Sequence, residues 1–263
     1  MFSKQLFNNF CIFPSDLTVA CVFVMQKVIT QCGAMSQALN CGVKVAGVTT
    51  VVQATHLKKK EPIIFKMEDA RKICDTWEKP VWRYKSTPNV EIEWRLGRVG
   101  SRFDPNVGKE TFDAVMDGLR KYTGWEETKA SEQTVYYFAN GARTTIDEKT
   151  DEETTVMKKN LVRVDSPLAA FPFDVRMSVA TETPMQRNEE DVATSVKTKK
   201  RWSFVRKNLS IDMTIMQGDP EDKDCDTDTT YHIEFEIVDP AKVESKDVFF
   251  NQIYKIFDLM KLI

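Results

Sequence analysis

Residues 90–96, Val-Glu-Ile-Glu-Trp-Arg-Leu, alternate charged and apolar side chains. In a β-strand this spacing sends the apolar side chains to one face and Glu91, Glu93 and Arg95 to the other. The apolar face needs a core. The opposite face places two carboxylates roughly 7 Å apart along the strand, where they repel unless a positive charge lies near them. This stretch therefore predicts a strand with one packed face and one charged face.

Four later segments follow the same rule: 173–182, 196–206, 209–216 and 229–238. Their polar faces carry, in strand order, Asp174, Arg176 and Ser178; Lys197, Lys199, Arg201 and Ser203; Ser210, Asp212 and Thr214; and His232, Glu234 and Glu236. For any single strand, a solvated face is the simpler interpretation. However, the charges are sorted by sign, whereas open faces usually mix them. Charged faces that line the inside of a barrel, around an anion and its metal, account for this sorting.

The other elements are predicted from periodicity and turn chemistry. Asn140-Gly141 is a hairpin signal between strands at 133–139 and 142–146, and a further strand spans 154–164. Helices are expected at 67–77, within 102–122 and at 245–262, with loops at 186–191 and 218–228. The apolar faces of the last two helices are Phe112, Val115, Met116 and Leu119, and Val248, Phe249, Ile253, Ile256, Phe257 and Met260. The fold class is mainly β (α+β), an antiparallel barrel or curled sheet with supporting helices.

Composition limits the partners. The chain has 263 residues, 42% of them hydrophobic and 29% charged, with a net charge of -2. A protein that grips a duplex broadly shows a basic excess, so a nucleic acid would be held only by a small part such as an end. The six cysteines form no CxxC pair, which argues against structural zinc and favours reduced thiols.

The N-terminal part differs from the rest. Its apolar run at 17–25 is far shorter than the ~20 residues of a membrane-spanning helix, so no membrane partner is expected. Residues 30–55 show no steady helical or strand period. We expect residues 1–60 to be a poorly ordered or accessory leader and 61–263 to be the catalytic domain. A signal peptide and an upstream extension of the reading frame are the alternatives for the leader.

The charged faces suit metal-phosphate chemistry. Two carboxylates at i and i+2 can share one hard cation, and a third from a neighbouring strand completes half of an octahedron, as Mg²⁺ or Mn²⁺ prefers. Lys and Arg side chains neutralise phosphate oxygens. A triphosphate carries roughly three to four negative charges, which matches several cations plus a metal.

Residues 91–97, Glu-Ile-Glu-Trp-Arg-Leu-Gly, resemble the first metal motif of the fungal, protozoan and large-DNA-virus RNA 5′-triphosphatases, mRNA-capping enzymes of the triphosphate tunnel metalloenzyme superfamily. Residues 102–107, Arg-Phe-Asp-Pro-Asn-Val, resemble the segment after it, and residues 231–236, Tyr-His-Ile-Glu-Phe-Glu, the last metal motif. The resemblance covers roughly residues 90–239. It implies an eight-stranded antiparallel tunnel with helices outside, and hydrolysis of the γ-phosphate of triphosphate-ended RNA. It also implies hydrolysis of nucleoside triphosphates, with Mg²⁺ or Mn²⁺ as cofactor.

The resemblance also implies residue roles. The metal ligands would be Glu91, Glu93 and Glu236. Glu234 and Glu182 would orient water, and Asp212 and Arg95 would support the site. The phosphate-binding residues would be Arg143, Lys158 or Lys159, Arg176, Lys197, Lys199 and Arg201, with Arg143, Arg176 and Arg201 also acting in catalysis.

Two positions depart from the family pattern. Ser210 stands where the family often has Arg, which implies a weaker phosphate clamp or compensation by Arg206. His232 stands where a third Glu is common, and its expected role is orientation or none. Neither change touches the three proposed ligands.

Other chemistries lack their residues. No cysteine is followed six positions later by Arg, which excludes a cysteine phosphatase, and no Gly-Lys-Ser/Thr P-loop is present. The only Asp-Gly, at 117–118, lacks the Lys of a guanylyltransferase motif, so a separate guanylyltransferase partner is expected. The acidic run 219–228 lacks the pattern of a calcium loop, and the two histidines do not favour a His-based metal site.

Three other functions stay open: a tripolyphosphatase of the same superfamily, a non-catalytic module that binds triphosphate ends, and a barrel with a polar face but no such site. Phe-x-Pro-x-Val at 103–107 and Arg-x-Ser-Phe at 201–204 favour the RNA enzyme. The role in capping implies the nucleus, or the cytoplasm for a virus-derived enzyme.

Overall fold

The computed structural model describes residues 44–45, 48–49, 67–188, 190–218 and 229–263. The chain divides into two units, residues 1–62 and residues 63–263. In the first, the two-residue strands β1 (Lys44–Val45) and β2 (Val48–Thr49) pair antiparallel, although no regular element was expected there. The rest of the expected leader, residues 1–60, lies outside the described residues.

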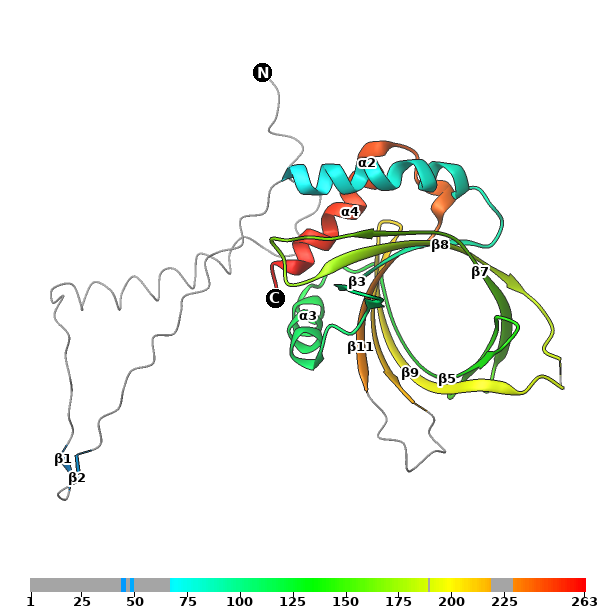
Figure 1. Cartoon of the computed structure of the whole chain (residues 1–263), viewed down its shortest axis with the longest axis horizontal. Coiled ribbons are helices and arrows are strands. Elements are labelled where there is room, and N and C mark those ends of the chain that lie inside the picture. Colours follow the sequence, from blue (N-terminus) through cyan, green and yellow to red (C-terminus); the bar gives the residue numbers. More distant parts are fainter. Residues whose placement is uncertain (1–43, 46–47, 50–66, 189, 219–228) are drawn as a thin grey trace. The chain divides into compact units, whose positions relative to one another are not determined.

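The second unit is a closed antiparallel barrel (Figure 1). Its sheet follows the order β11-β10-β9-β5-β6-β7-β8-β3, and a β11–β3 pairing closes it. The strands are β3 (Val90–Val99), β5 (Glu127–Phe138), β6 (Ala142–Asp147), β7 (Glu153–Ser166), β8 (Asp174–Pro184), β9 (Ala193–Arg206), β10 (Leu209–Gln217) and β11 (Thr230–Ile237). The short β4 (Phe103–Asp104) pairs with the end of β3. The predicted barrel is confirmed, and every predicted strand matches one of these elements, three of them extending one residue beyond it at one or both ends.

The hairpin between β5 and β6 turns at Asn140-Gly141, as predicted. Gly141 has a φ of 88°, a region that glycine enters without steric cost. The amide of Ala142 donates to Oδ1 of Asn140 at 2.9 Å. The turn chemistry and the backbone therefore agree.

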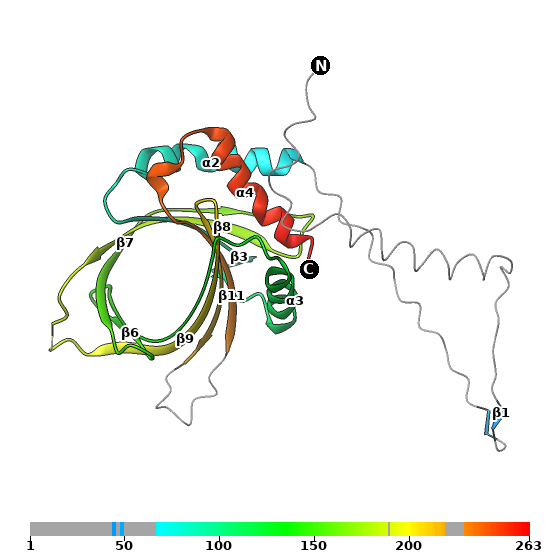
Figure 2. The same cartoon turned by 180° about the vertical axis from the view of Figure 1, so that it is seen from behind.

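Three helices support the barrel: α2 (Met67–Tyr84), α3 (Lys109–Lys121) and α4 (Lys246–Met260), with a 3-10 turn η1 (Pro240–Lys242) before α4. Figures 1 and 2 show α2 and α4 together against one side of the barrel and α3 beside β11. None of the helices in the described ranges has the length and apolarity to cross a membrane.

The helix bounds differ from the predicted ones for physical reasons. The first helix runs beyond residue 77 and through Pro80, because Val81 continues the buried stripe one turn after Trp77. The second, Lys109–Lys121, lies within the predicted segment and follows the short strand at Phe103–Asp104. In α4, the predicted core residue Val248 is 40% exposed, whereas Phe249 is fully buried.

The core lies between the outer face of the barrel and the helices. Trp94 of β3 is completely buried there, with its ring 6.2 Å from that of Phe235 and 6.1 Å from that of Trp77. The predicted apolar residues of α3 are all buried. Because the apolar faces of the strands point outward to this core, the charged faces of β3, β9, β10 and β11 line the inside of the barrel.

Phe249→Ala should lower the free energy of unfolding by about 3–5 kcal/mol, because the ring fills a site against Trp94 and Trp82. Its neighbour Val248 is exposed, so Val248→Ala should change the same quantity by no more than about 0.5 kcal/mol. Urea unfolding of both variants measures the difference. Equal losses would contradict the placement of α4 on the barrel.

Candidate active site

Two glutamates face each other across the β3–β11 seam that closes the barrel. Glu236 lies directly opposite Glu93, and Glu234 lies opposite Arg95. Like charges in such a pair have Cβ atoms about 4.5–5.5 Å apart and repel. Burial, together with Glu91 and Asp212, raises the pKa of Glu236 to about 7. Within the described residues Glu236 has no ion-pair partner, whereas Glu93 is paired with Arg95.

Arg95 holds the neighbouring pair of carboxylates. Its Nη2 lies 3.0 Å from Oε1 of Glu93, and its Nε lies 3.0 Å from Oε1 of Glu234. Burial by itself would raise the pKa of Glu234, but Arg95 and Arg201 hold it well below its usual range. Glu234 is therefore an ionised acceptor at neutral pH and a weak base.

Arg201 of β9 ties three strands together. Its Nη1 lies 3.0 Å from Oδ2 of Asp212, and its Nη2 donates to Oε2 of Glu234 at 2.8 Å. Its Nε donates to Oγ1 of Thr214 at 3.2 Å. Asp212 and Glu234 lie opposite each other on β10 and β11, so one guanidinium neutralises both carboxylates.

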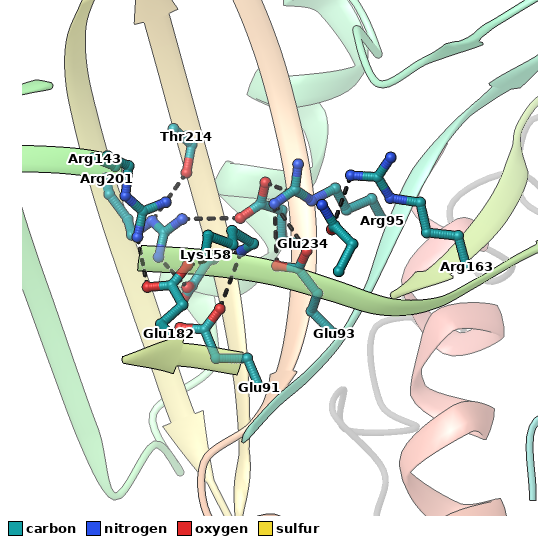
Figure 3. Close-up of polar contacts among 12 residues, drawn as sticks. Glu91, Glu93, Arg95, Arg143, Lys158, Arg163, Glu182, Arg201, Thr214 and Glu234 are labelled. Atoms are coloured by element: carbon teal, nitrogen blue, oxygen red, sulfur yellow. Dashed lines mark hydrogen bonds and ion pairs between the residues drawn. The ribbon is translucent and has the colours of Figure 1, made fainter. Parts of the chain in front are cut away.

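Lys158 of β7 forms ion pairs with carboxylates on both β8 and β3. Its Nζ lies 2.8 Å from Oε1 of Glu182 and 3.1 Å from Oε2 of Glu91. Nη2 of Arg143 donates to the second oxygen of Glu182 at 2.6 Å. Lys158 pairs in register with Glu182, so the alternation sends Lys159 to the opposite face, where it is exposed. Of the two predicted lysines, the structure brings only Lys158 to the cluster (Figure 3).

Lys197 and Lys199 lie on β9 on the same face as Arg201, because the three residues are spaced two apart along the strand. Neither lysine forms an ion pair within the described ranges. Burial and the nearby Arg201 lower the pKa of Lys199 to about 8. A buried cation that loses water without gaining a carboxylate is suited to accept an anion.

Arg176 lies apart from the Arg143–Lys158 group. Its Nε and Nη2 donate to Asp165 at 2.6 and 2.9 Å, and its guanidinium lies 4.4 Å from the centre of the Phe103 ring. It lines a cavity that we call the Phe103 pocket. The lining includes Glu93, Arg95, Phe103, Lys158, Arg163 and Arg176.

In the described ranges, no group of three or more His, Cys, Asp or Glu side chains is gathered so as to hold an ion. Glu91 points to Lys158 and Glu93 to Arg95. Nevertheless, two opposed carboxylates, of which Glu236 has no ion-pair partner in the described ranges, with a third carboxylate two residues along, are a donor set that suits Mg²⁺ or Mn²⁺. Glu91 and Glu93 would exchange their cationic partners for the metal.

Residues 137–261 match a family model described as mRNA capping enzyme, beta chain. The fold resembles the Schizosaccharomyces pombe Pct1 RNA triphosphatase, with a TM-score of 0.61 at 15% identity, covering 81% of this chain and 99% of that chain. The chain therefore shares the fold of these RNA triphosphatases, and the family model matches its C-terminal part. A second Pct1 structure, in complex with the Spt5 CTD, gives 0.61 at 16% identity, covering 80% and 98%.

The Mimivirus capping enzyme triphosphatase gives a TM-score of 0.50 at 12% identity and covers 75% of this chain and 99% of that chain. No curated protein matches the sequence. The family model starts at residue 137, so it includes β11 and the cations Lys197, Lys199 and Arg201 of β9, which we call the basic row, but not β3. The place of Glu91 and Glu93 in the tunnel therefore rests on the strand register.

The departures from the RNA triphosphatase pattern have a structural setting. The hydroxyl of Ser210 donates to Oδ1 of Asp212 at 2.6 Å. Ser210 therefore orients the carboxylate that forms an ion pair with Arg201. Arg206 lies 5.3 Å from the centre of the Tyr122 ring, which belongs to the C-cap of α3 outside the barrel. The expected compensation by Arg206 is therefore wrong, because odd and even residues of β9 face opposite sides. Burial lowers the pKa of His232 to about 4, so its imidazole is neutral.

Thr214 is the residue that the sequence prediction assigned no role. It is 1% exposed, lies opposite Arg201 in the β9–β10 register, and accepts the Nε bond. The spacing Ser210-x-Asp212-x-Thr214 already placed it on the charged face. A hydroxyl side chain two residues after Asp212 was the feature of the sequence from which a role for Thr214 could have been predicted.

Proposed function

We propose that this protein hydrolyses the γ-phosphate of 5′-triphosphate RNA, the first step of mRNA capping, with Mg²⁺ or Mn²⁺. Nucleoside triphosphates are further substrates. The observation that carries the proposal is the opposed pair Glu93/Glu236, set in a tunnel whose other wall carries Lys197, Lys199 and Arg201. Within the described residues Glu236, Lys197 and Lys199 form no ion pair, and a carboxylate and cations in this state are suited to a metal-bound polyphosphate.

In this proposal Glu91, Glu93 and Glu236 hold the metal, which supplies positive charge at the terminal phosphate when it is bound. The basic row and Arg143 bind phosphate oxygens. Glu234 accepts a hydrogen bond from the attacking water and orients it, because its low pKa makes it a poor proton acceptor. Glu182, held by Lys158 and Arg143, has an orienting role.

The reaction balances simply. The water oxygen forms a bond to the γ-phosphorus, and the bond from that phosphorus to the β–γ bridging oxygen breaks. The β-phosphate keeps the electron pair. The products are diphosphate-ended RNA and phosphate, with one proton released to solvent.

The biological setting is part of the proposal. The absence of a guanylyltransferase motif in the sequence supports a separate guanylyltransferase partner. Capping of nascent transcripts supports a nuclear location, or a cytoplasmic one for a viral protein. We also propose that residues 61–263 suffice for catalysis and that residues 1–60 are accessory.

The test compares γ-phosphate release from triphosphate-ended RNA and from tripolyphosphate, each with Mg²⁺ or Mn²⁺. We expect RNA hydrolysis by the wild type and none by Glu93→Ala. Near-normal rates in Glu93→Ala would show that the site is misplaced. A strong preference for tripolyphosphate would favour the tripolyphosphatase alternative, and RNA binding without turnover would favour the non-catalytic module.

A further inference from the structure

We propose that the Phe103 pocket binds the first nucleoside of the RNA and the phosphodiester that follows it. This inference rests on the proposed function and names its substrate class: a triphosphate carried on a polynucleotide. The pocket is continuous with the catalytic cluster, because its lining includes Glu93, Arg95 and Lys158. Its lining also includes Phe103 and Arg163, neither of which the triphosphate site uses. A substrate whose phosphates fill the cluster would extend into this space.

Phe103 is held in place by the backbone. A Cβ atom on Gly97 would lie 2.5 Å from Cζ of Phe103 and 2.3 Å from the carbonyl oxygen of Asp104, so only glycine lets the ring sit there. Arg176 lies 4.4 Å from the ring centre and is itself fixed by Asp165. An aromatic ring beside a guanidinium is a platform on which any nucleobase can stack.

A β-bulge aims the polar residues of the pocket. The β7–β8 register shifts between Asn160 and Val162, so that Asn160 lies opposite Ala180 and Arg163 opposite Ser178. Ala180 and Ser178 share one face of β8. The bulge therefore turns Arg163 to the same side as Asn160, although the two residues are three apart. Nη2 of Arg163 donates to Oδ1 of Asn160 at 2.8 Å (Figure 3).

The chemistry of this pocket matches a nucleotide better than a free polyphosphate. Tripolyphosphate has neither a base to stack nor a fourth phosphate. Arg163 is exposed, with further donors to offer, and a guanidinium binds a phosphodiester through two parallel hydrogen bonds. ATP offers a base but no phosphodiester. The three substrates therefore separate the roles of Phe103 and Arg163.

The experiment measures kcat/KM of the full chain for a short triphosphate-ended RNA, ATP and tripolyphosphate. For Phe103→Leu, which keeps apolar contact with Gly97, the RNA to tripolyphosphate ratio should fall about tenfold, chiefly through KM, and Phe103→Trp should restore it. Arg163→Gln should lower the ratio of kcat/KM for RNA to kcat/KM for ATP. It should also reduce the slope of log affinity for RNA against log salt concentration by about 1. Tyr122→Leu is the matched control, because it also removes a ring beside an arginine but lies outside the barrel.

Wild-type ratios in Phe103→Leu and Arg163→Gln would overturn the inference. Equilibrium binding of the same RNA, with tripolyphosphate as competitor, is measured in parallel. Should the wild type hydrolyse none of the substrates while RNA binding still weakens in Phe103→Leu, the proposed activity fails and the pocket assignment stands. If the wild type hydrolyses RNA and neither substitution changes the ratios, the proposed activity stands and the pocket assignment fails.

Discussion

Glu236→Gln should abolish hydrolysis and at the same time stabilise the metal-free protein. Glu236 faces Glu93 across the seam and has no ion-pair partner in the described ranges, so removing its charge relieves repulsion. The gain in free energy of unfolding should be roughly 1–3 kcal/mol above pH 7, where this partly buried carboxylate, whose pKa is raised to about 7, is ionised. Loss of a metal ligand should cost several kcal/mol in the barrier, a fall of about 10³-fold or more in kcat/KM.

Thermal unfolding with a chelator and with added Mn²⁺ tests this prediction. Metal should raise the midpoint of the wild type and leave Glu236→Gln unchanged, since only a protein that binds the ion is stabilised by it. Glu132→Gln is the control, because this carboxylate is exposed and pairs with Lys200 on the outer side. A Glu236→Gln variant that is less stable without metal, or still active with it, would contradict the assignment of this carboxylate.

Arg201→Ala should lose both stability and activity. The substitution leaves Asp212 and Glu234 buried with one cation fewer, which should lower the free energy of unfolding by about 3–5 kcal/mol. Activity should fall by roughly 10²–10³-fold, as when one preorganised donor to a developing charge is removed. Arg201→Lys should recover only part of the loss, because one ammonium cannot reproduce the three bonds of the guanidinium.

Lys200→Ala is the matched control on the same strand. Its side chain points outward to an exposed glutamate, so its loss should cost less than about 1 kcal/mol and leave hydrolysis intact. Adding Asp212→Asn to Arg201→Ala should recover stability but not activity, because it removes one of the two stranded charges. Additive losses in the double variant would show that the two residues do not interact.

Local sequence patterns predicted the strands, because the alternation of polar and apolar residues within one segment is enough to indicate a strand. The run from Leu209 to Met216 and the Asn140-Gly141 turn needed no distant information. The helices were less predictable. Val248 has an apolar side chain at a plausible spacing, yet it faces solvent, because the stripe on α4 is set by where the barrel lies.

Partners inside the tunnel were not predictable in the same way. Alternation placed Glu91, Glu93, Glu234 and Glu236 on inner faces, but it does not say that Glu93 meets Glu236 while Arg201 bridges Glu234 and Asp212. Those pairs depend on the register with which the barrel closes. The bulge that turns Arg163 inward is likewise invisible to a strict period of two.

The sequence by itself therefore determined the fold class, the charged inner faces and the chemical character of the site, because side chains alternate along a strand whatever its neighbours are. Only the tertiary structure decided which charges are neutralised. Register and closure set the distances between side chains on different strands, and electrostatic energy depends on those distances. Arg206 lies on the same strand as the basic row but on its outer face, where it contacts Tyr122 and takes no part in the tunnel. The charge of a residue alone therefore does not predict whether it belongs to the site.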